Sequence, residues 1–387
     1  MYNNRLMRTS WKTQAILARL QADLDALQQQ SQFRQVGKIA GINLCSNDYL
    51  ALSDDPRLRQ AVIAALQRQD LALCSTGSRL LSGNSPAWEE FESRAAAFTG
   101  AEAALAFSSG YMANIGLLAS IAGPESTVFS DSANHASIID GLRLSRARKV
   151  IFPHNDLQGL EDRLKADTGS QERIIVVESI FSMDGDLAPL QELYGLADKY
   201  DAGIIVDEAH ATGVVGPQGR GLVAQSGRPD CVIASVHTCG KALAAMGAFV
   251  ACSQTLRQYL VNMARTFIFS TALAPHAAIQ ATEALSLASA ADDRRHHLQA
   301  LAATLRRGLN ERGFDTSRSA SHIVPVILGS NDRALRTAES LSAQGFGVKA
   351  VRPPTVPAGT SRLRLSLTAR LTHDQVNALL QAIGAAN

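Results

Sequence analysis

From about Asn43 to Pro275, short apolar runs rich in β-branched residues alternate with longer stretches that have helical spacing. The runs are apolar almost throughout, which is typical of strands that are buried on both faces. Seven of them predict strands: AALAFSS, STVFSD, KVIFPH, RIIVVES, AGIIVDE, CVIASV and GAFVACS. The pattern therefore predicts an α/β fold with a mostly parallel central sheet that is covered by helices.

The segments on either side of this region follow other patterns. Apolar residues recur at helical spacing in the first thirty positions, at Trp11, Ile16, Leu17, Leu20, Leu24 and Leu27. They predict an amphipathic helix that packs on the body of the protein or on a partner chain. After Pro275, helical stretches alternate with HIVPVILG and with the strand pair GVKAV and RLRLSLT, as in a smaller α/β domain. We predict a helical segment over 1–45, a large domain over 46–275 and a small domain over 276–387.

Composition narrows the classes of function. The 387 residues, of which 46% are hydrophobic, suffice for a sizeable core. Lys+Arg 37 nearly balances Asp+Glu 35, so we expect neither nucleic acid nor a membrane among the partners. Five cysteines without CxxC spacing argue against a disulfide framework or a structural zinc site. With no apolar leader and no run of 18 apolar residues, we expect a cytoplasmic protein.

Lys241 is the most informative single residue. It follows a strand and lies in a turn of small residues, between Thr238 and Ala242. A lysine in this position can form a Schiff base with an aldehyde cofactor, and small neighbours let a flat ring approach the backbone. Taken alone, however, such a lysine is more often a solvated loop residue.

Asp207 and His210 make the cofactor interpretation stronger. They are three residues apart, with Asp207 at the end of the run AGIIVDE and His210 just after it, upstream of Lys241. A carboxylate here can pair with a protonated pyridine nitrogen, which keeps the ring able to accept electrons from a substrate carbanion. His210 can then reach the phenolic oxygen or the substrate. The alternative is a helix cap with a surface histidine, but together with Lys241 the pair favours an enzyme that uses pyridoxal 5'-phosphate.

A strand, a glycine turn and a helix follow one another in AFSSGYMANIGLLASI. Free N–H groups at a helix start bind anions, so Gly110, Tyr111 and Met112 are candidates for the cofactor phosphate. Such turns are common, and about half of them bind nothing. Hydroxyl groups suited to the same phosphate, each of which is also explained as a turn or cap, are those of Thr238, Ser270 and Thr271.

Three further side chains suit a ring or an amino-acid substrate. His135, in NHAS, can lie flat against the ring or simply cap the next helix, and Ser182, in FSMDGD, can bond the ring oxygen. Arg362 and Arg364 share one face of the strand RLRLSLT, where one of them can be buried. The fork of Arg364 matches a carboxylate; the alternative is a pair of solvated arginines on an edge strand.

Taken together, these motifs resemble those of the α-oxoamine synthases, which are pyridoxal-phosphate enzymes of fold type I that join an amino acid to an acyl thioester. The motifs are GYMAN, NHAS, FSMDGDLAPL, DEAHATGVVGPQGRG, the turn with Thr238, Gly240 and Lys241, and RLRLSLT. They occur in the family's order from about Asn47 to the C-terminus. The resemblance implies a large domain with a mostly parallel sheet and a smaller C-terminal α/β domain.

The resemblance also implies a role for each candidate. Lys241 is the Schiff-base lysine, Asp207 pairs with the pyridinium, His135 stacks on the ring, and His210 and Ser182 border its oxygen. Gly110, Tyr111 and Thr238 match phosphate positions, and Ser270 and Thr271 match residues that reach the phosphate of the neighbouring subunit, so a homodimer with shared sites is implied. Arg364 matches the arginine that holds the substrate carboxylate, and Asn47 borders the site.

The segment from Arg352 to Thr368 is most similar to family members that condense L-alanine with a pimeloyl thioester in biotin biosynthesis. Either coenzyme A or acyl carrier protein can be the carrier. Alternatives are a sibling that uses glycine or serine with another acyl chain, an aminotransferase of the same fold, and a non-catalytic cofactor-binding protein.

Five positions bear on the acyl substrate. Trp88 stands where the family usually has a histidine, and Ala51 and Ala245 replace common glycines. Gln28 falls near the place of a substrate-binding arginine of some relatives, for which Arg34 is a possible substitute. None of these departures changes the residues expected around the cofactor ring.

Overall fold

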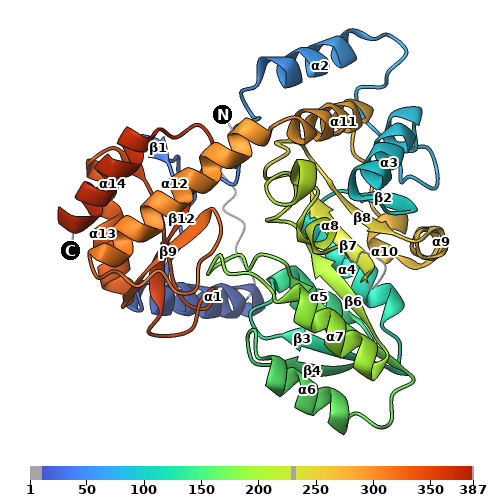
Figure 1. Ribbon diagram of the computed structural model, residues 1–387, viewed down its shortest axis with the longest axis horizontal. Coiled ribbons are helices and arrows are strands. Elements are labelled where there is room, and N and C mark those ends of the chain that lie inside the picture. Colours follow the sequence, from blue (N-terminus) through green and yellow to red (C-terminus); the bar gives the residue numbers. More distant parts are fainter. Residues whose placement is uncertain (1–10, 228–231, 386–387) are drawn as a thin grey trace.

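A seven-stranded sheet forms the centre of the larger of two lobes in the computed structural model, which describes residues 11–227 and 232–385 (Figure 1). The strand order is β2-β8-β7-β6-β5-β3-β4, and only β8 runs against the others. The predicted mostly parallel sheet is therefore confirmed. Its strands are β2 (Ala103–Phe107), β3 (Ser126–Asp131), β4 (Arg148–Phe152), β5 (Glu172–Glu178), β6 (Ala202–Asp207), β7 (Val232–Thr238) and β8 (Ala248–Cys252).

Both faces of this sheet are buried, as the continuous apolar runs predict. Ile174 and Val176 pack into a core with α4, whereas Ile175 and Val177 pack into a second core with α6 and α7 on the opposite face. The helices of the large lobe are α2 (Pro56–Gln67), α3 (Pro86–Thr99), α4 (Gly110–Ile121), α5 (Ala136–Leu144), α6 (Leu157–Ala166), α7 (Leu190–Tyr200), α8 (Leu222–Ser226), α9 (Gln254–Met263), α10 (Arg265–Ile268) and α11 (Pro275–Ser289), with a short 3₁₀ turn η1 (Pro217–Gly219).

The smaller lobe is built on an antiparallel sheet of order β11-β12-β9. Its elements are β9 (Ile323–Gly329), β11 (Ala350–Val351), β12 (Ser361–Ser366), α12 (Asp292–Glu311), α13 (Asn331–Ala343) and α14 (His373–Ala385). A segment from the start of the chain joins it, because β1 (Ile42–Asn43) pairs in parallel with β10 (Phe346–Gly347). The helix α11 packs on α3 and α2 of the large lobe. The exact domain boundaries stay predictions.

The amphipathic helix predicted near the N-terminus is α1 (Trp11–Gln29), which lies beside the small lobe (Figure 1). The described residues of the body do not cover its apolar side chains, since Ile16, Leu17, Leu20, Leu24 and Leu27 are 37–55% exposed. The body of this chain therefore does not bury this face, and its packing on a partner chain stays a prediction. None of the helices within 11–227 and 232–385 is long and apolar enough to cross a membrane.

Parallel strands end at one edge of a sheet, and this edge gathers the polar residues of interest. Asp131, Glu178, Asp207 and Thr238 are the last residues of β3, β5, β6 and β7. Glu178 and Asp207 are register partners. In open α/β sheets ligands bind outside these carboxyl ends, so the fold places the candidate site there.

Candidate active site

Lys241 lies in the tight connection between the antiparallel strands β7 and β8. The connection is closed by backbone bonds from Cys239 N to Gly247 O at 2.9 Å and from Ala245 N to Cys239 O at 2.9 Å. Small residues permit this close approach, so the lysine is held at the carboxyl edge of the sheet, as its sequence context predicts.

A chain of side-chain hydrogen bonds starts at Lys241 and crosses to the small lobe. Lys241 Nζ is 2.8 Å from His210 Nε2, and His210 Nδ1 is 2.7 Å from Tyr49 Oη. Tyr49 Oη donates to Asn47 Oδ1 at 2.9 Å, and Asn47 Oδ1 also accepts from Arg364 Nη1 at 3.2 Å. Every bond in the chain has one donor if His210 is protonated at Nδ1. The structure thus connects four predicted site residues through Tyr49.

Electrostatics at the lysine end favour proton transfer. Burial lowers the pKa of Lys241 to about 8, against the opposing charges of Asp207 and Glu178. Burial also lowers the pKa of His210 well below its usual value, and the Lys241 cation acts in the same direction. His210 is therefore neutral at neutral pH, and Lys241 loses its proton far more readily there than an ordinary lysine does.

Asp207 is the centre of a second set of hydrogen bonds. Its Oδ2 accepts from Asn114 Nδ2 at 2.7 Å and its Oδ1 accepts from the backbone N–H of Ala209 at 2.9 Å. Asn114 Nδ2 also donates to Ser137 Oγ at 2.9 Å, and Ser137 Oγ is 2.8 Å from Nδ1 of the exposed His135. The buried carboxylate and the imidazole predicted to stack on the ring are therefore positioned by one network.

Arg364 and Ser182 meet where the two lobes face each other. Arg364 Nε donates to the carbonyl oxygen of Ser182 at 2.5 Å, and Nη1 also bonds Ser366 Oγ. The neighbouring Arg362 is buried and donates to Asp184 Oδ1 at 2.7 Å. The expectation that one of the two arginines is buried is met by Arg362, whereas Arg364 is half-buried.

The turn predicted to bind the phosphate lies at the start of α4. Ser109 caps the helix by accepting from Met112 N at 3.2 Å, so the N–H of Met112 is already used. The first N–H groups of a helix have no partner within the helix, which leaves Gly110 and Tyr111 as donors. A Cβ added to Gly110 would lie 3.5 Å from Thr238 Cβ, which places these two positions side by side. The Tyr111 hydroxyl, in contrast, donates to Asp140.

Ser270 and Thr271 lie in a different cavity, which they line together with Arg79, Trp88 and Ser108. Thr271 forms an isolated β-bridge with Ser78. Within one subunit the structure does not bring Ser270 and Thr271 to Lys241. Their role at the phosphate of a neighbouring subunit stays a prediction.

The structure shows the surroundings of the departures from the family pattern. Trp88 is buried, and its indole N–H donates to the carbonyl oxygen of Leu273 at 3.0 Å. Ala51 has φ 55, the left-handed conformation that glycine adopts most easily. Ala245 is buried in the lysine turn. Gln28 is exposed on α1, and Arg34 donates to Thr355 Oγ1 at 3.1 Å.

These features fit pyridoxal phosphate. The fit is in the chemistry of the set: a buried amine with a lowered pKa, a buried carboxylate with two donors, and free N–H groups beside the Thr238 hydroxyl. The cofactor needs one such group each for its aldehyde, its ring nitrogen and its phosphate. The residues present can therefore hold it.

Sequence reasoning did not single out several polar residues of the site: Tyr49, Asn114, Ser137 and Glu178. Asn114 lies one helical turn after Gly110 within GYMAN, and Tyr49 lies two residues after Asn47. Glu178 ends the strand that pairs with the Asp207 strand. The position of Glu178 at a strand end is the signal that could have revealed it.

Comparison with known proteins agrees with this site. A family model described as aminotransferase class I and II matches residues 39–383. The 8-amino-7-oxononanoate synthase of Anaeromyxobacter dehalogenans (strain 2CP-1 / ATCC BAA-258) is 48% identical over 351 residues, which cover 91% of this chain and 87% of that relative. The protein of the same name from Geobacter sulfurreducens is 43% identical over 368 residues, with coverages of 91% and 93%.

Solved structures give the same result. Serine palmitoyltransferase from S. paucimobilis, with a bound PLP–myriocin aldimine, superposes with a TM-score of 0.88 at 31% identity, covering 96% of this chain and 97% of that chain. An 8-amino-7-oxononanoate synthase from Francisella tularensis has a TM-score of 0.77 at 28% identity, covering 89% and 97%.

This chain therefore belongs to the aminotransferase class I and II family, as an α-oxoamine synthase of fold type I that depends on pyridoxal phosphate. The relatives that match about 90% of its length at 42–50% identity carry the name 8-amino-7-oxononanoate synthase.

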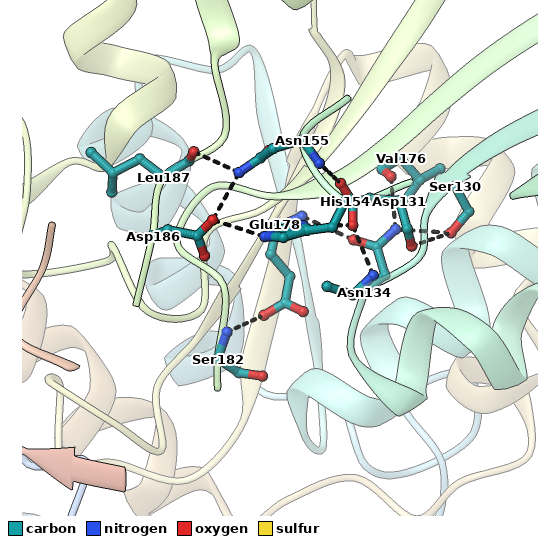
Figure 2. Close-up of polar contacts among 11 residues, drawn as sticks. Ser130, Asp131, Asn134, His154, Asn155, Val176, Glu178, Ser182, Asp186 and Leu187 are labelled. Carbon is teal, nitrogen blue, oxygen red and sulfur yellow. Dashed lines mark hydrogen bonds and ion pairs between the residues drawn. The ribbon is translucent and has the colours of Figure 1, made fainter. Parts of the chain in front are cut away.

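His154 connects two parts of the site: the end of β3 and the loop that contains Ser182 (Figure 2). Its Nδ1 is 2.9 Å from Asp131 Oδ1 and its Nε2 is 2.8 Å from Asp186 Oδ2. Burial alone lowers the pKa of His154, but the hydrogen bonds to Asp131 and Asp186 outweigh it and raise the pKa to about 10. The imidazolium is thus clamped between two carboxylates.

We expect this clamp to make stability depend on pH. Because the folded pKa lies above the ordinary value near 6.5, the stabilisation is complete below about pH 6.5 and is lost as pH rises towards about 10. The difference in the free energy of unfolding between the wild type and His154→Gln should shrink over that range. Urea denaturation at a series of pH values measures it, with the exposed His296→Gln as control. A difference that is constant with pH contradicts the clamp.

Proposed function

We propose that this chain condenses L-alanine with a pimeloyl thioester, giving 8-amino-7-oxononanoate, carbon dioxide and the free thiol carrier in biotin biosynthesis. One observation carries the proposal: the hydrogen-bond chain from Lys241 through His210 and Tyr49 to Asn47 and Arg364. It sets a proton acceptor and a carboxylate-binding cation in one site, as an amino-acid substrate that is deprotonated at Cα requires. The names of the relatives support the choice of both substrates.

Each residue then has a stated task. Pyridoxal phosphate, when bound, supplies an aldehyde that takes up the amino group and a ring that stabilises negative charge on the adjacent carbon. Arg364, held by Ser182 and Asn47, binds the alanine carboxylate and orients the Cα–H bond. Lys241 Nζ takes the Cα proton, aided by its lowered pKa. Neutral His210 orients Nζ and can bond the oxyanion that forms when the thioester carbonyl is attacked.

The cofactor-holding residues are those gathered at the strand ends. Asp207 pairs with the ring nitrogen, and the bonds from Asn114 and Ala209 keep its carboxylate in place. His135 lies against the ring, and Ser182 borders the ring oxygen. The N–H groups of Gly110 and Tyr111 and the hydroxyl of Thr238 bind the phosphate.

A second candidate is a sibling synthase that uses glycine or serine. It is favoured by the TM-score of 0.88 with a serine palmitoyltransferase, against 0.77 with the synthase from Francisella tularensis. An assay of carbon dioxide release separates the two candidate functions. Carbon dioxide release should require alanine together with a pimeloyl thioester; release with serine or glycine and another acyl chain would replace our proposal by the sibling activity. Comparing pimeloyl-CoA with pimeloyl acyl carrier protein identifies the carrier.

We further propose a homodimer whose sites are shared, with Ser270 and Thr271 reaching the cofactor phosphate of the partner subunit. Exposed apolar residues flank the bridge between Ser78 and Thr271, namely Leu81 at 85% and Phe269 at 70% exposure. The apolar face of α1 is exposed too. A second copy of the chain would cover these groups. The cytoplasmic location stays a prediction from the sequence.

For Lys241→Ala we expect turnover to fall by about 10²- to 10⁴-fold or more, because the general base is lost. The variant should still bind the cofactor, but borohydride should no longer fix the cofactor to the protein. Carbon dioxide release and the mass of the reduced protein measure the two effects. Lys199→Ala, at an exposed lysine paired with Glu161, is the matched control. Normal turnover by Lys241→Ala would refute the assignment.

For Arg364→Lys we expect the KM for alanine to rise about tenfold or more, because an ammonium cannot replace a guanidinium fork at a carboxylate. Steady-state kinetics at saturating thioester measure it. Arg362→Lys serves as comparison: it should lower stability through the bond to Asp184 and leave the KM for alanine nearly unchanged. Equal KM effects in both variants would remove Arg364 from the substrate site.

The dimer makes a prediction that does not depend on chemistry. Light scattering should give twice the chain mass of 41.2 kDa. Leu81→Glu should weaken the dimer and activity together, because a charge would be buried in the interface. Leu144→Glu, at a residue that is 64% exposed on α5, should leave both unchanged. A fully active monomer would overturn the shared site.

A further inference from the structure

Glu178 is a buried acid to which neither the mechanism above nor the sequence analysis gives a role. It is 2% exposed and ends β5, in register with Asp207 at the end of β6. Register partners on parallel strands send their side chains to the same face, on backbones about 4.8 Å apart. The Glu178 side chain therefore leaves the sheet beside the carboxylate that is expected to hold the ring nitrogen.

The two oxygens of the Glu178 carboxyl differ. Oε2 accepts from the backbone N–H of Ser182 at 3.2 Å (Figure 2). Oε1 is buried and has no hydrogen-bond partner within the described residues. A buried oxygen without a partner costs free energy unless a ligand supplies one.

Glu208, the other buried glutamate at this edge, is a structural acid with which Glu178 can be compared. Its oxygens accept from the Ser179 hydroxyl and from the backbone N–H groups of Leu222 and Val223, at 2.7–3.0 Å. Those bonds hold the start of α8, so both oxygens of Glu208 are satisfied inside the protein. Glu178, in contrast, leaves Oε1 without a partner among the described residues.

The surroundings of Glu178 favour its neutral form. Burial raises the pKa of Glu178 to about 8, and the charge of Asp207 adds to the rise. The cation of Lys241 and the backbone N–H groups of His135 and Ser182 act in the opposite direction. At neutral pH the carboxyl therefore keeps a proton, and because Oε2 already accepts a hydrogen bond, Oε1 is the oxygen free to donate.

We propose that Glu178 is a neutral carboxylic acid that donates a hydrogen bond from Oε1 to the phenolic oxygen of the cofactor ring, next to Ser182. The inference rests on the proposed function for the placement of the ring. It adds to that function a further positioning residue, whose contribution to binding disappears when its proton is lost. The backbone of Ser182 links it to Arg364, since the Ser182 N–H bonds Glu178 and the Ser182 carbonyl oxygen accepts from Arg364.

The experiment compares Lys241→Ala with Lys241→Ala/Glu178→Gln. Because both variants lack Lys241, neither a covalent bond between the lysine and the cofactor nor the titration of the lysine affects the result. The dissociation constant of pyridoxal phosphate is measured by fluorescence from pH 7 to 10. Removing the Lys241 cation moves the Glu178 transition above pH 8. The amide of glutamine can donate at every pH, and titration of the ring nitrogen affects both proteins alike. The ratio of the two dissociation constants therefore isolates Glu178.

We expect the ratio, Lys241→Ala over the double variant, to grow up to about tenfold per pH unit above the Glu178 pKa. With 3-deoxypyridoxal 5'-phosphate, which lacks the phenolic oxygen, the ratio should stay constant. Adding Glu208→Gln in place of Glu178→Gln should not remove the pH dependence. Circular dichroism verifies that each variant is folded. The comparison of pyridoxal phosphate with the 3-deoxy compound can also be made on Lys241→Ala alone, without any change at Glu178.

A ratio that is constant from pH 7 to 10 would overturn the inference, and so would an equal rise with the 3-deoxy compound. Neither result touches the proposed function, which is tested by carbon dioxide release from alanine and pimeloyl thioester. Conversely, a rising ratio in a protein that releases no carbon dioxide would refute the condensation and retain the role of Glu178.

Discussion

Burial of charged groups at the carboxyl ends of parallel strands is the constraint on which this structure depends. Strands β5 and β6 end in register at Glu178 and Asp207, and β7 runs in parallel beside β6, so the ends of the three strands lie at one edge of the sheet whatever their residues are. Here they include two carboxyl groups, with a lysine in the connection that follows. Close packing on both faces of the sheet keeps water away, and electrostatic interactions at this edge are therefore strong.

The protein resolves this constraint by giving almost every buried polar atom a defined partner. Asp207 has two donors, and His210 connects the lysine to Tyr49. These bonds orient the groups before any substrate arrives, which reduces the reorganisation that the reaction needs. Glu178 Oε1 is one of the few exceptions among the described residues, and its position beside Asp207 is the reason for assigning it a ligand.

The sequence was sufficient to predict the seven strands, the parallel sheet and the residues brought to its edge, because continuous apolar runs between helices leave few other folds. It did not predict Tyr49 or Asn114, whose importance comes from partners distant in the sequence, His210 and Asp207. Periodicity placed Arg362 and Arg364 on one face but could not say which is buried, since that depends on Asp184 across the lobe boundary. The role proposed for Ser270 and Thr271 depends on a second subunit, which no pattern within one chain describes.

The loop that carries Ser182 is bonded to both lobes. His154 and Asn155 bind Asp186 from the large lobe, whereas Arg362 and Arg364 bind Asp184 and the Ser182 carbonyl oxygen from the small lobe. A rotation of one lobe against the other would therefore displace Ser182, the residue that we propose borders the ring oxygen. Mutations of Arg364 in β12, far from the sheet edge in sequence, can in this way displace Ser182, so substrate preference and interdomain geometry would have to evolve together.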